Sequence, residues 1–393
     1  MQPITQNGRT AIVLRDPIGI SDKTLVVPQQ VAPLLVLCDG TRDANGLRAA
    51  LAVRYGTALT PDTVERALTA LDDALFLYNE RFAQAYAEAL EQYRAAPFRP
   101  ARLANESYPA EANDLRRFLD NSFAATPNDR IPSITTGRGL VSPHIDYGRG
   151  TPVYAAVWEQ ATEMVRQADL VILAGTDHHG GEGKFTLTRQ HYATPFGVLP
   201  TDQDTVEELA QAIGPENAFA DELHHRVEHS IELAAVWLHY VREEQPCEIV
   251  PILCGSFAHY VRGDADPIQD LTLQALVQTL RKRMAGRRTL VVAAADLSHI
   301  GPAFGGQSVD LAGRAQLQEH DNRMIERICA GDAAGFFAHM RATGDRYNVC
   351  GLPPIDLTLR LLENARGTQI AYDRCPADGQ STSWVSICGI IFE

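Results

Sequence analysis

The stretch LVILAGTDHH, residues 170–179, joins an unbroken apolar run to two adjacent histidines. A short apolar run without alternation is typical of a strand buried on both faces, as in parallel or mixed sheets. Further runs of this kind are GLVS (139–142), IVPILCG (249–255), TLVVAAA (289–295) and WVSICGIIF (384–392). Helical stretches such as QALVQTLRKRM (274–284) and IDLTLRLLENA (355–365) lie between them. The alternation predicts an α/β fold, one sheet with helices on both faces.

The first part of the chain has a different pattern. AIVLRD (11–16) and TLVV (24–27) are short strand-like runs, and residues 43–56 form a helical stretch that ends at Gly56. A second helix is expected from Pro61, capped by Thr60. The pattern LLVLCDGTRD (34–43), LRAALAVRYG (47–56) and VERALTALDDALFL (64–77), with its Asp-Gly turn and helix spacing, resembles the PqqD-like winged-helix domains, which bind peptides. We therefore expect a winged-helix-like domain over 1–82, a helical linker over 83–104 and a large α/β domain over 105–393.

Charge and composition exclude several classes of protein. The chain of 393 residues is 45% hydrophobic and 21% charged, and its formal net charge is −14. Such a surface disfavours nucleic acid and anionic membranes as partners. Residues 1–82 carry eight Lys and Arg against nine Asp and Glu, so the small domain lacks the basic face of a DNA reader. Because neither a membrane-spanning run nor a signal-peptide pattern is found, we expect a cytoplasmic protein.

The seven cysteines do not suggest a disulfide framework. Their number is odd, their spacing is loose and no CxxC pair occurs. Most are expected to be small buried hydrophobic residues.

Polar residues follow three of the apolar runs directly: PHIDYG after GLVS, TDHH after LVILAG, and DLSHIG after TLVVAAA. Ligands of open α/β sheets bind beyond the carboxyl ends of the strands. His144, either His178 or His179, and His299 are therefore expected to converge in one crevice. A single histidine in such a place is usually structural, and the case for function depends on three independent occurrences.

Two other segments carry candidate residues. In EHSIE (228–232), His229 and Glu232 are three apart and share a helix face, which fits either a solvent-facing carboxylate or a pair that orients a metal-bound histidine. The nearby His224 and His225 are expected at the surface. Cys350 precedes a helix and is a structural cysteine, a metal ligand or a nucleophile.

Taken in order, these motifs resemble the Memo family, whose bacterial and archaeal members are called AmmeMemoRadiSam system protein B. PHIDYG is similar to the family's PHAGY, TDHH to PSHH, EHSIE to EHSIE itself, VPILCG to VPILVG, ADLSHIG to SSDxSHxG, and VCG to its CG element. The resemblance covers about residues 105–393. It implies a fold similar to class III extradiol dioxygenases, which are non-haem iron enzymes. It also implies that His144, His178 and Cys350 bind a metal, and that His299 has the acid/base position.

The chain departs from the family pattern at four positions. Ile145 and Asp146 replace Ala-Gly, and Thr176 and Asp177 replace Pro-Ser. We expect Asp146, Asp177, His179, Glu228, His229 and Glu232 to support the metal or contact substrate, and Asp296 to orient His299. A thiolate in place of the carboxylate of a facial triad softens the site, so we expect Fe(II) or Cu(I), with Zn(II) as a further candidate.

Three functions are compatible with these residues. The first is a metal-dependent oxidoreductase. The second is a non-catalytic module that binds a peptide or partner in the same cleft, and the third is a hydrolase that uses Cys350 with a histidine base. The resemblance implies radical-SAM and AMMECR1-type proteins as partners, and a peptide or protein ligand for the N-terminal domain.

Overall fold

The computed structural model describes residues 2–6, 9–126, 134–243 and 245–393. It divides into two compact units, 1–95 and 96–393. The expected linker, 83–104, is shared between them. Helix α4 (Glu80–Ala95) belongs to the first unit, whereas Arg99 is fully buried in the second.

The N-terminal unit contains an antiparallel three-stranded sheet in the order β1-β2-β3 and a group of helices. The sequence signals for its helices are confirmed: Asp43 caps α2, Gly56 ends it in the left-handed conformation, and Thr60 caps α3. Leu34, in a helix that the sequence pattern did not indicate, contributes to the small core. The elements are β1 (Gln2–Gln6), β2 (Arg9–Arg15), β3 (Thr24–Pro28), α1 (Ala32–Leu37), α2 (Ala44–Tyr55), α3 (Pro61–Asp73) and α4.

The larger unit is built on an eight-stranded mixed sheet, with the order β11-β13-β4-β10-β5-β9-β6 and β12 paired to β13. Strands β4, β10, β5 and β9 are parallel neighbours. All five apolar runs predicted as strands are strands. Their bounds, with the remaining strands, are β4 (Gly139–Ser142), β5 (Leu170–Thr176), β6 (Phe185–Leu187), β7 (Tyr192–Thr194), β8 (Gly197–Leu199), β9 (Glu248–Cys254), β10 (Thr289–Ala294), β11 (His299–Ile300), β12 (Gly367–Pro376) and β13 (Trp384–Phe392).

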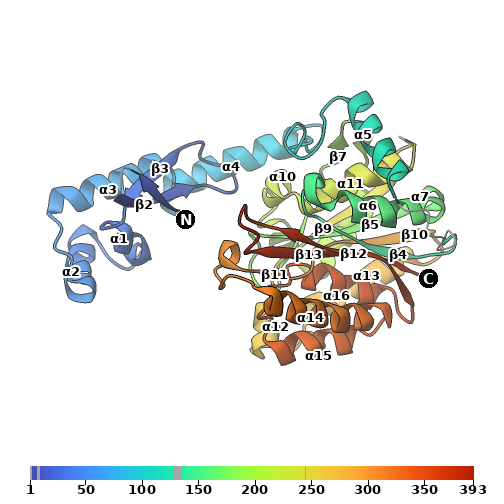
Figure 1. The fold of residues 1–393 in the computed structure, drawn as a ribbon. Helices are drawn as coiled ribbons and strands as arrows, with labels where there is room; N and C mark the ends of the chain where they lie inside the picture. Colours follow the sequence, from blue (N-terminus) through green and yellow to red (C-terminus); the bar gives the residue numbers. More distant parts are fainter. Residues whose placement is uncertain (1, 7–8, 127–133, 244) are drawn as a thin grey trace. The chain divides into compact units, whose positions relative to one another are not determined.

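Helices cover both faces of this sheet, as expected (Figure 1). One face packs against α5 (Ala112–Ala124), α6 (Tyr147–Gln160), α7 (Thr162–Gln167) and α11 (Ser230–Val241). The other packs against α8 (Gln203–Ile213), α9 (Pro215–Phe219), α12 (Ala258–Arg262), α13 (Leu271–Met284), α14 (Leu311–Cys329), α15 (Ala333–Thr343) and α16 (Leu352–Leu361). The short helices α10 (His224–Val227) and η1 (Pro302–Phe304) lie in connections.

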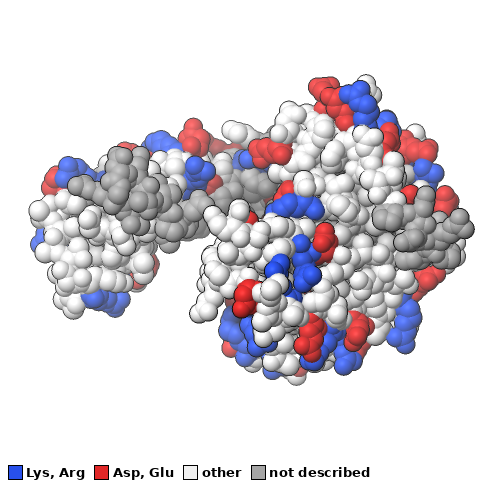
Figure 2. Space-filling model, in the orientation of Figure 1, with Lys and Arg blue, Asp and Glu red and all other residues white. Residues whose placement is uncertain are grey.

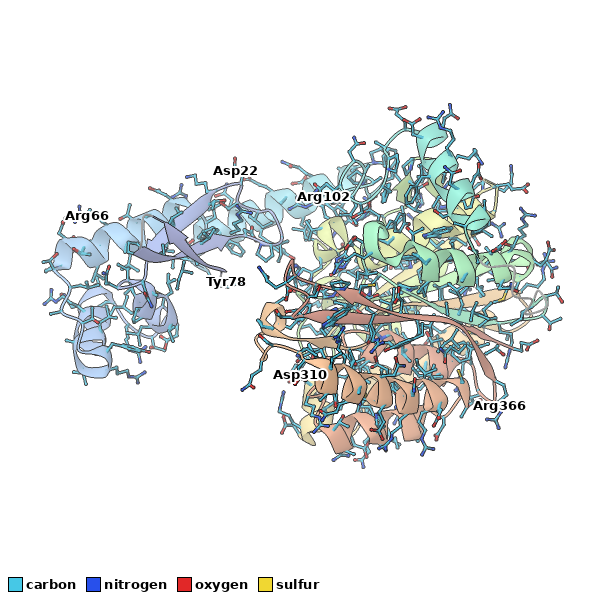
Figure 3. All side chains as sticks on the ribbon, in the orientation of Figure 1. Asp22, Arg66, Tyr78, Arg102, Asp310 and Arg366 are labelled. Carbon is cyan, nitrogen blue, oxygen red and sulfur yellow. The ribbon has the colours of Figure 1, made fainter. Side chains whose placement is uncertain are left out.

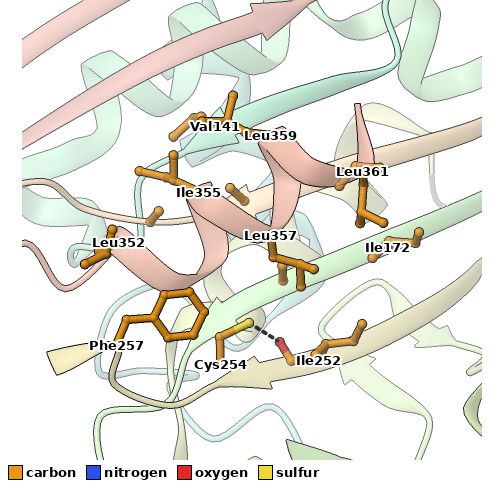
Figure 4. Packing of buried hydrophobic residues seen from close by; sticks show 14 of the residues in the cluster. Val141, Ile172, Ile252, Cys254, Phe257, Leu352, Ile355, Leu357, Leu359 and Leu361 are labelled. Atoms are coloured by element: carbon orange, nitrogen blue, oxygen red, sulfur yellow. Dashed lines mark hydrogen bonds between the residues drawn. The ribbon is translucent and has the colours of Figure 1, made fainter. Parts of the chain in front are cut away.

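Helix α16 holds the centre of one face. Figure 4 shows Leu357 of this helix directed towards Ile172 of β5 and Ile252 of β9, whereas Ile355 lies beside Val141 of β4. Each is fully buried, and full burial of such a side chain contributes about 1.5–3 kcal/mol. The helix therefore fixes the position of the loop before it, which carries Cys350.

Charged side chains of both signs lie on the visible surface of the larger unit (Figure 2). On the face in Figure 2, the coloured Lys and Arg side chains of the larger unit are interspersed with Asp and Glu. Within the described residues, every helix is too short or too polar to cross a membrane.

Candidate metal centre

Three neighbouring parallel strands end at the same edge of the sheet. His144 follows β4, Asp296 follows β10 and His178 follows β5. These residues line a cavity of about 710 Å³, together with His229, His299 and Cys350. The structure therefore brings together the histidines that the strand-end argument placed in one crevice, and of His178 and His179 it is His178 that lines the cavity.

The environment of His144 fixes its tautomer. Its Nδ1 lies 2.9 Å from the carbonyl oxygen of Ala294, which can only accept, so Nδ1 carries the proton. The lone pair of Nε2 is then directed towards Cys350, whose Sγ is 3.2 Å away. Burial, followed by the neighbouring imidazoles, lowers the pKa of His144 well below its ordinary value. A neutral imidazole with a free Nε2 is the form that binds metals.

Glu228 performs the same task for His178. Its carboxylate accepts from Nδ1 of His178 at 3.1 Å and lies 3.0 Å from Nδ1 of His229. It also accepts from the backbone N–H groups of His178, His229 and Ser230. Burial raises the pKa of Glu228, but the bonds from His178 and His229 outweigh it and hold the pKa well below the ordinary value. A carboxylate behind a histidine is the usual support of a metal ligand.

Hydrogen bonds to the backbone of Cys350 and Gly351 fix the position of Cys350. Thr176 donates from its hydroxyl to the Cys350 carbonyl at 3.0 Å, and the Gly351 N–H donates to the Asp296 carbonyl at 3.0 Å. A Cβ at Gly351 would lie 2.3 Å from that carbonyl oxygen, so only glycine permits the close approach. Burial, then the charge of Asp296, raises the pKa of Cys350 well above its ordinary value. The metal-free thiol is therefore protonated and is not an activated nucleophile, which counts against the hydrolase hypothesis.

The donor atoms are close enough to share one ion. Nitrogen atoms of His144 and His178 and the sulfur of Cys350 lie within 4.8 Å of one another. A second group, His178, Glu228 and His229, meets the same criterion. The Glu228 oxygens are already engaged by five hydrogen-bond donors, so the first group is the better ligand set. Two imidazoles and a thiolate fit a soft or borderline transition metal.

His299 lies at the wall of this cavity. Its Nδ1 is 3.1 Å from the Leu297 carbonyl oxygen, so Nδ1 carries the proton and Nε2 is the free acceptor. Its ring meets Phe304 edge to face, at 5.0 Å between centroids. Burial lowers the pKa of His299 to about 4. It is therefore neutral near pH 7.

The carboxylate of Asp296 does not perform the role expected of it. Its Oδ1 accepts from the backbone N–H groups of His144 and Ile145, at 2.7 and 3.1 Å, and the Nδ1 of His299 bonds to Leu297 instead. The loop folds so that Asp296 supports the turn of His144. Burial raises the pKa of Asp296.

The other candidates have separate positions. Asp146 caps α6, pairs with Arg149 and lines the cavity. Asp177 is buried and accepts from Nδ1 of His224 at 2.9 Å, while His179 is exposed. Glu232 faces Arg99 and Tyr108 rather than the histidines.

The expectation that His224 and His225 lie at the surface is wrong. Both are buried, and His225 bonds to the Tyr192 hydroxyl and the Thr186 carbonyl. Their polarity misled the prediction, because buried polar partners are not visible in a local pattern. Sequence reasoning also missed Leu103, Phe304 and Asn348 in the cavity wall, which carry no motif.

The comparisons with known proteins identify the family of the larger unit. The family model described as Memo-like protein matches residues 99–391. A MEMO1 family protein of Aquifex aeolicus is 27% identical over 387 residues, which are 97% of this chain and 95% of that protein. One of Thermus thermophilus is 26% identical over 81% of this chain and 90% of its own length, and one of Methanopyrus kandleri is 29% identical over 66% and 85%. Because the family model matches well over half of its length, this chain belongs to the Memo-like protein family.

Proposed function

We propose that the chain binds one transition metal ion through His144, His178 and Cys350 and acts as an oxidoreductase on an organic ligand held in the adjoining cavity. One observation carries the proposal. The Nδ1 atoms of both histidines are bonded to acceptors, the Ala294 carbonyl and the Glu228 carboxylate, which leaves the Nε2 atoms as the available ligand nitrogens. Nε2 of His144 lies 3.2 Å from the Cys350 sulfur. Histidines that bind a metal almost always donate their other ring N–H to a carboxylate or a backbone carbonyl in this way.

The surrounding residues have definite tasks in this proposal. A bound redox-active metal would supply electron transfer with the ligand or with O₂. His299 lines the cavity with its Nδ1 bonded to Leu297, so its neutral Nε2 can accept a hydrogen bond from the ligand. Leu233, Phe304 and Val385 line the same cavity and favour an apolar ligand body. The donor set favours Fe(II) or Cu(I), while Zn(II) would leave only Lewis-acid or structural roles.

The test is elemental analysis of anaerobically purified protein. We expect about one metal ion per chain in the wild type and loss of most of it in the His144→Ala, His178→Ala and Cys350→Ala variants. Cys38→Ser, a thiol substitution in the N-terminal unit, is the control and should keep the metal. Full metal occupancy in all three cavity variants would exclude the proposal.

The second candidate is a binding module without turnover. The cavity volume is in the range of small-molecule sites, which supports saturable binding by itself. The two functions differ in one measurement. Oxygen consumption or reduction of a dye by the metal-loaded protein, lost in Cys350→Ala, supports the oxidoreductase, whereas binding with no turnover supports the module.

A further inference from the structure

Residues 99–108, which we call the strap, form a compact turn against the start of helix α11. The Leu103 carbonyl accepts from the N–H groups of Glu106 and Ser107, and the Asn105 N–H donates to the Tyr108 carbonyl at 2.7 Å. Asn105 has a φ of 65°, a left-handed conformation that asparagine tolerates better than most residues. The strap is therefore a defined turn rather than an extended connection.

A buried ion pair fastens the strap. Arg99 and Glu232 are both fully buried and bonded to each other. Glu232 also accepts from the Leu103 N–H at 2.7 Å, from the Arg102 N–H at 3.1 Å and from the Tyr108 hydroxyl. One carboxylate thus fixes both ends of the turn.

The ion pair of Arg99 and Glu232 is also connected to Glu228, the carboxylate that orients the proposed metal ligand His178. Arg99 donates to the carbonyl oxygens of His225 and Glu228, at 2.7 and 2.9 Å. The Glu228 side chain orients His178 and His229. The backbone that presents Glu228 is therefore tied to the strap.

The inner side of the strap is a wall of the cavity. Leu103 and Ser107 line it together with Cys350, His178 and His299. Leu103 also packs against the buried cluster on this face of the sheet. A ligand that reaches Cys350 shares the cavity with the Leu103 side chain.

From these contacts we infer that the strap determines which ligands reach the metal centre. Leu103 is the residue that limits ligand size, and Arg99 with Glu232 is the pair that positions it. This inference rests on the proposed function for the nature of the ligand. It extends that function because it assigns the strap as the part of the cavity wall that selects an apolar ligand body.

The test measures access to Cys350 in full-length protein from which metal has been removed by a chelator. Each cysteine is followed by peptide mass spectrometry during alkylation with a small reagent, iodoacetamide, and a bulky one, N-(1-pyrenyl)maleimide. In Leu103→Ala and Glu232→Gln we expect the bulky-to-small rate ratio at Cys350 to rise about tenfold, because the wall is removed or loosened. Arg102→Ala is the matched control. Arg102, labelled in Figure 3, is half-exposed and pairs with Glu106, so its substitution should leave the ratio unchanged.

The fully buried Cys254 and Cys388 report on global unfolding in the same samples. If Glu232→Gln makes Cys254 and Cys388 reactive, that variant is unfolded and only the result for Leu103→Ala is used. Leu103→Ala shortens one side chain at the cavity wall and leaves the ion pair intact. An unchanged ratio at Cys350 in a folded Leu103→Ala variant would overturn the inference. Because the measurement needs no metal, its outcome is independent of the elemental analysis.

Discussion

At the scale of single residues, the proposed metal centre depends on carboxylates that lie outside its proposed ligand set. Glu228 is buried, charged and surrounded by donors from His178, His229 and Ser230. An uncompensated buried carboxylate would be costly, so the five donors are what allow it to remain ionised. The ligand geometry is thus built into the start of helix α11.

This arrangement makes Glu228→Gln informative. The amide can keep one acceptor oxygen but turns its other end into a donor that faces N–H groups. We expect metal affinity to fall about 10- to 100-fold with His178 still present. A competition titration against a chromophoric chelator measures it, with the exposed Glu163→Gln as control. Equal affinities for the two variants would contradict the role given to Glu228.

His225 allows a prediction about pH. Its Nε2 donates to the Thr186 carbonyl and its Nδ1 accepts from the Tyr192 hydroxyl, an arrangement that requires the neutral ring. Burial lowers its pKa in the folded protein to about 4, whereas the unfolded chain takes up a proton below about 6.5. The stability that His225 contributes is therefore complete above that pH and is lost as the pH falls towards 4.

The comparison of wild type with His225→Asn isolates this effect. The difference in free energy of unfolding should shrink between about pH 6 and pH 4.5, by up to ~1.4 kcal/mol per pH unit. Urea unfolding at several pH values measures it. A difference that stays constant with pH would mean that His225 is not the titrating group.

The residue-level predictions succeeded where a side chain follows a buried strand. His144, His299 and one of the pair His178 and His179 were placed in one crevice in this way, because parallel strands end at one edge and the sequence marks where each strand stops. The true partner of Asp296 could not be predicted, since it depends on how two loops pack across the sheet. The strap could not be predicted either, because its contacts join residues more than 120 positions apart.

At the scale of elements, the position of Cys350 depends on helix α16 and on the turn before it. Gly351 lies against the end of β10, where a Cβ would be 2.3 Å from the Asp296 carbonyl and 2.7 Å from the Ala295 Cβ. The apolar runs and helix caps made the elements predictable. The contact at Gly351 was not, because a local pattern does not indicate how closely two backbones approach.

We expect Gly351→Ala to displace the Cys350 loop and to lose metal nearly as Cys350→Ala does, although every ligand is present. Gly379→Ala is the matched control, since a Cβ there meets no atom within 4 Å. Metal content and melting temperature are measured for both. Full metal content in Gly351→Ala, with an unchanged melting temperature, would show that the loop tolerates the added methyl group.

At the scale of the whole molecule, the question is where the unit that holds the proposed metal centre begins. The change in sequence pattern suggests a start at residue 105, whereas the compact unit starts at 96 and the family model at 99. A start at residue 105 instead of residue 99 omits residues 99–104, which include Arg99 and form the first half of the strap. Removing Arg99 leaves Glu232 buried without its cation, and breaking one partner of a buried pair costs about 3–5 kcal/mol.

Two fragments therefore have opposite expected outcomes. The fragment 96–393 keeps the ion pair and should fold and bind metal with an affinity within about threefold of the full chain, since all the proposed ligands belong to this unit. The fragment 105–393 should be poorly folded or have a melting temperature several degrees lower, about 2–4 °C per kcal/mol lost for a unit of this size. Thermal unfolding and metal content of both fragments test this. If 105–393 matched 96–393 in both measurements, the buried pair would be dispensable, and the strap would be an appendage rather than part of the metal-binding unit.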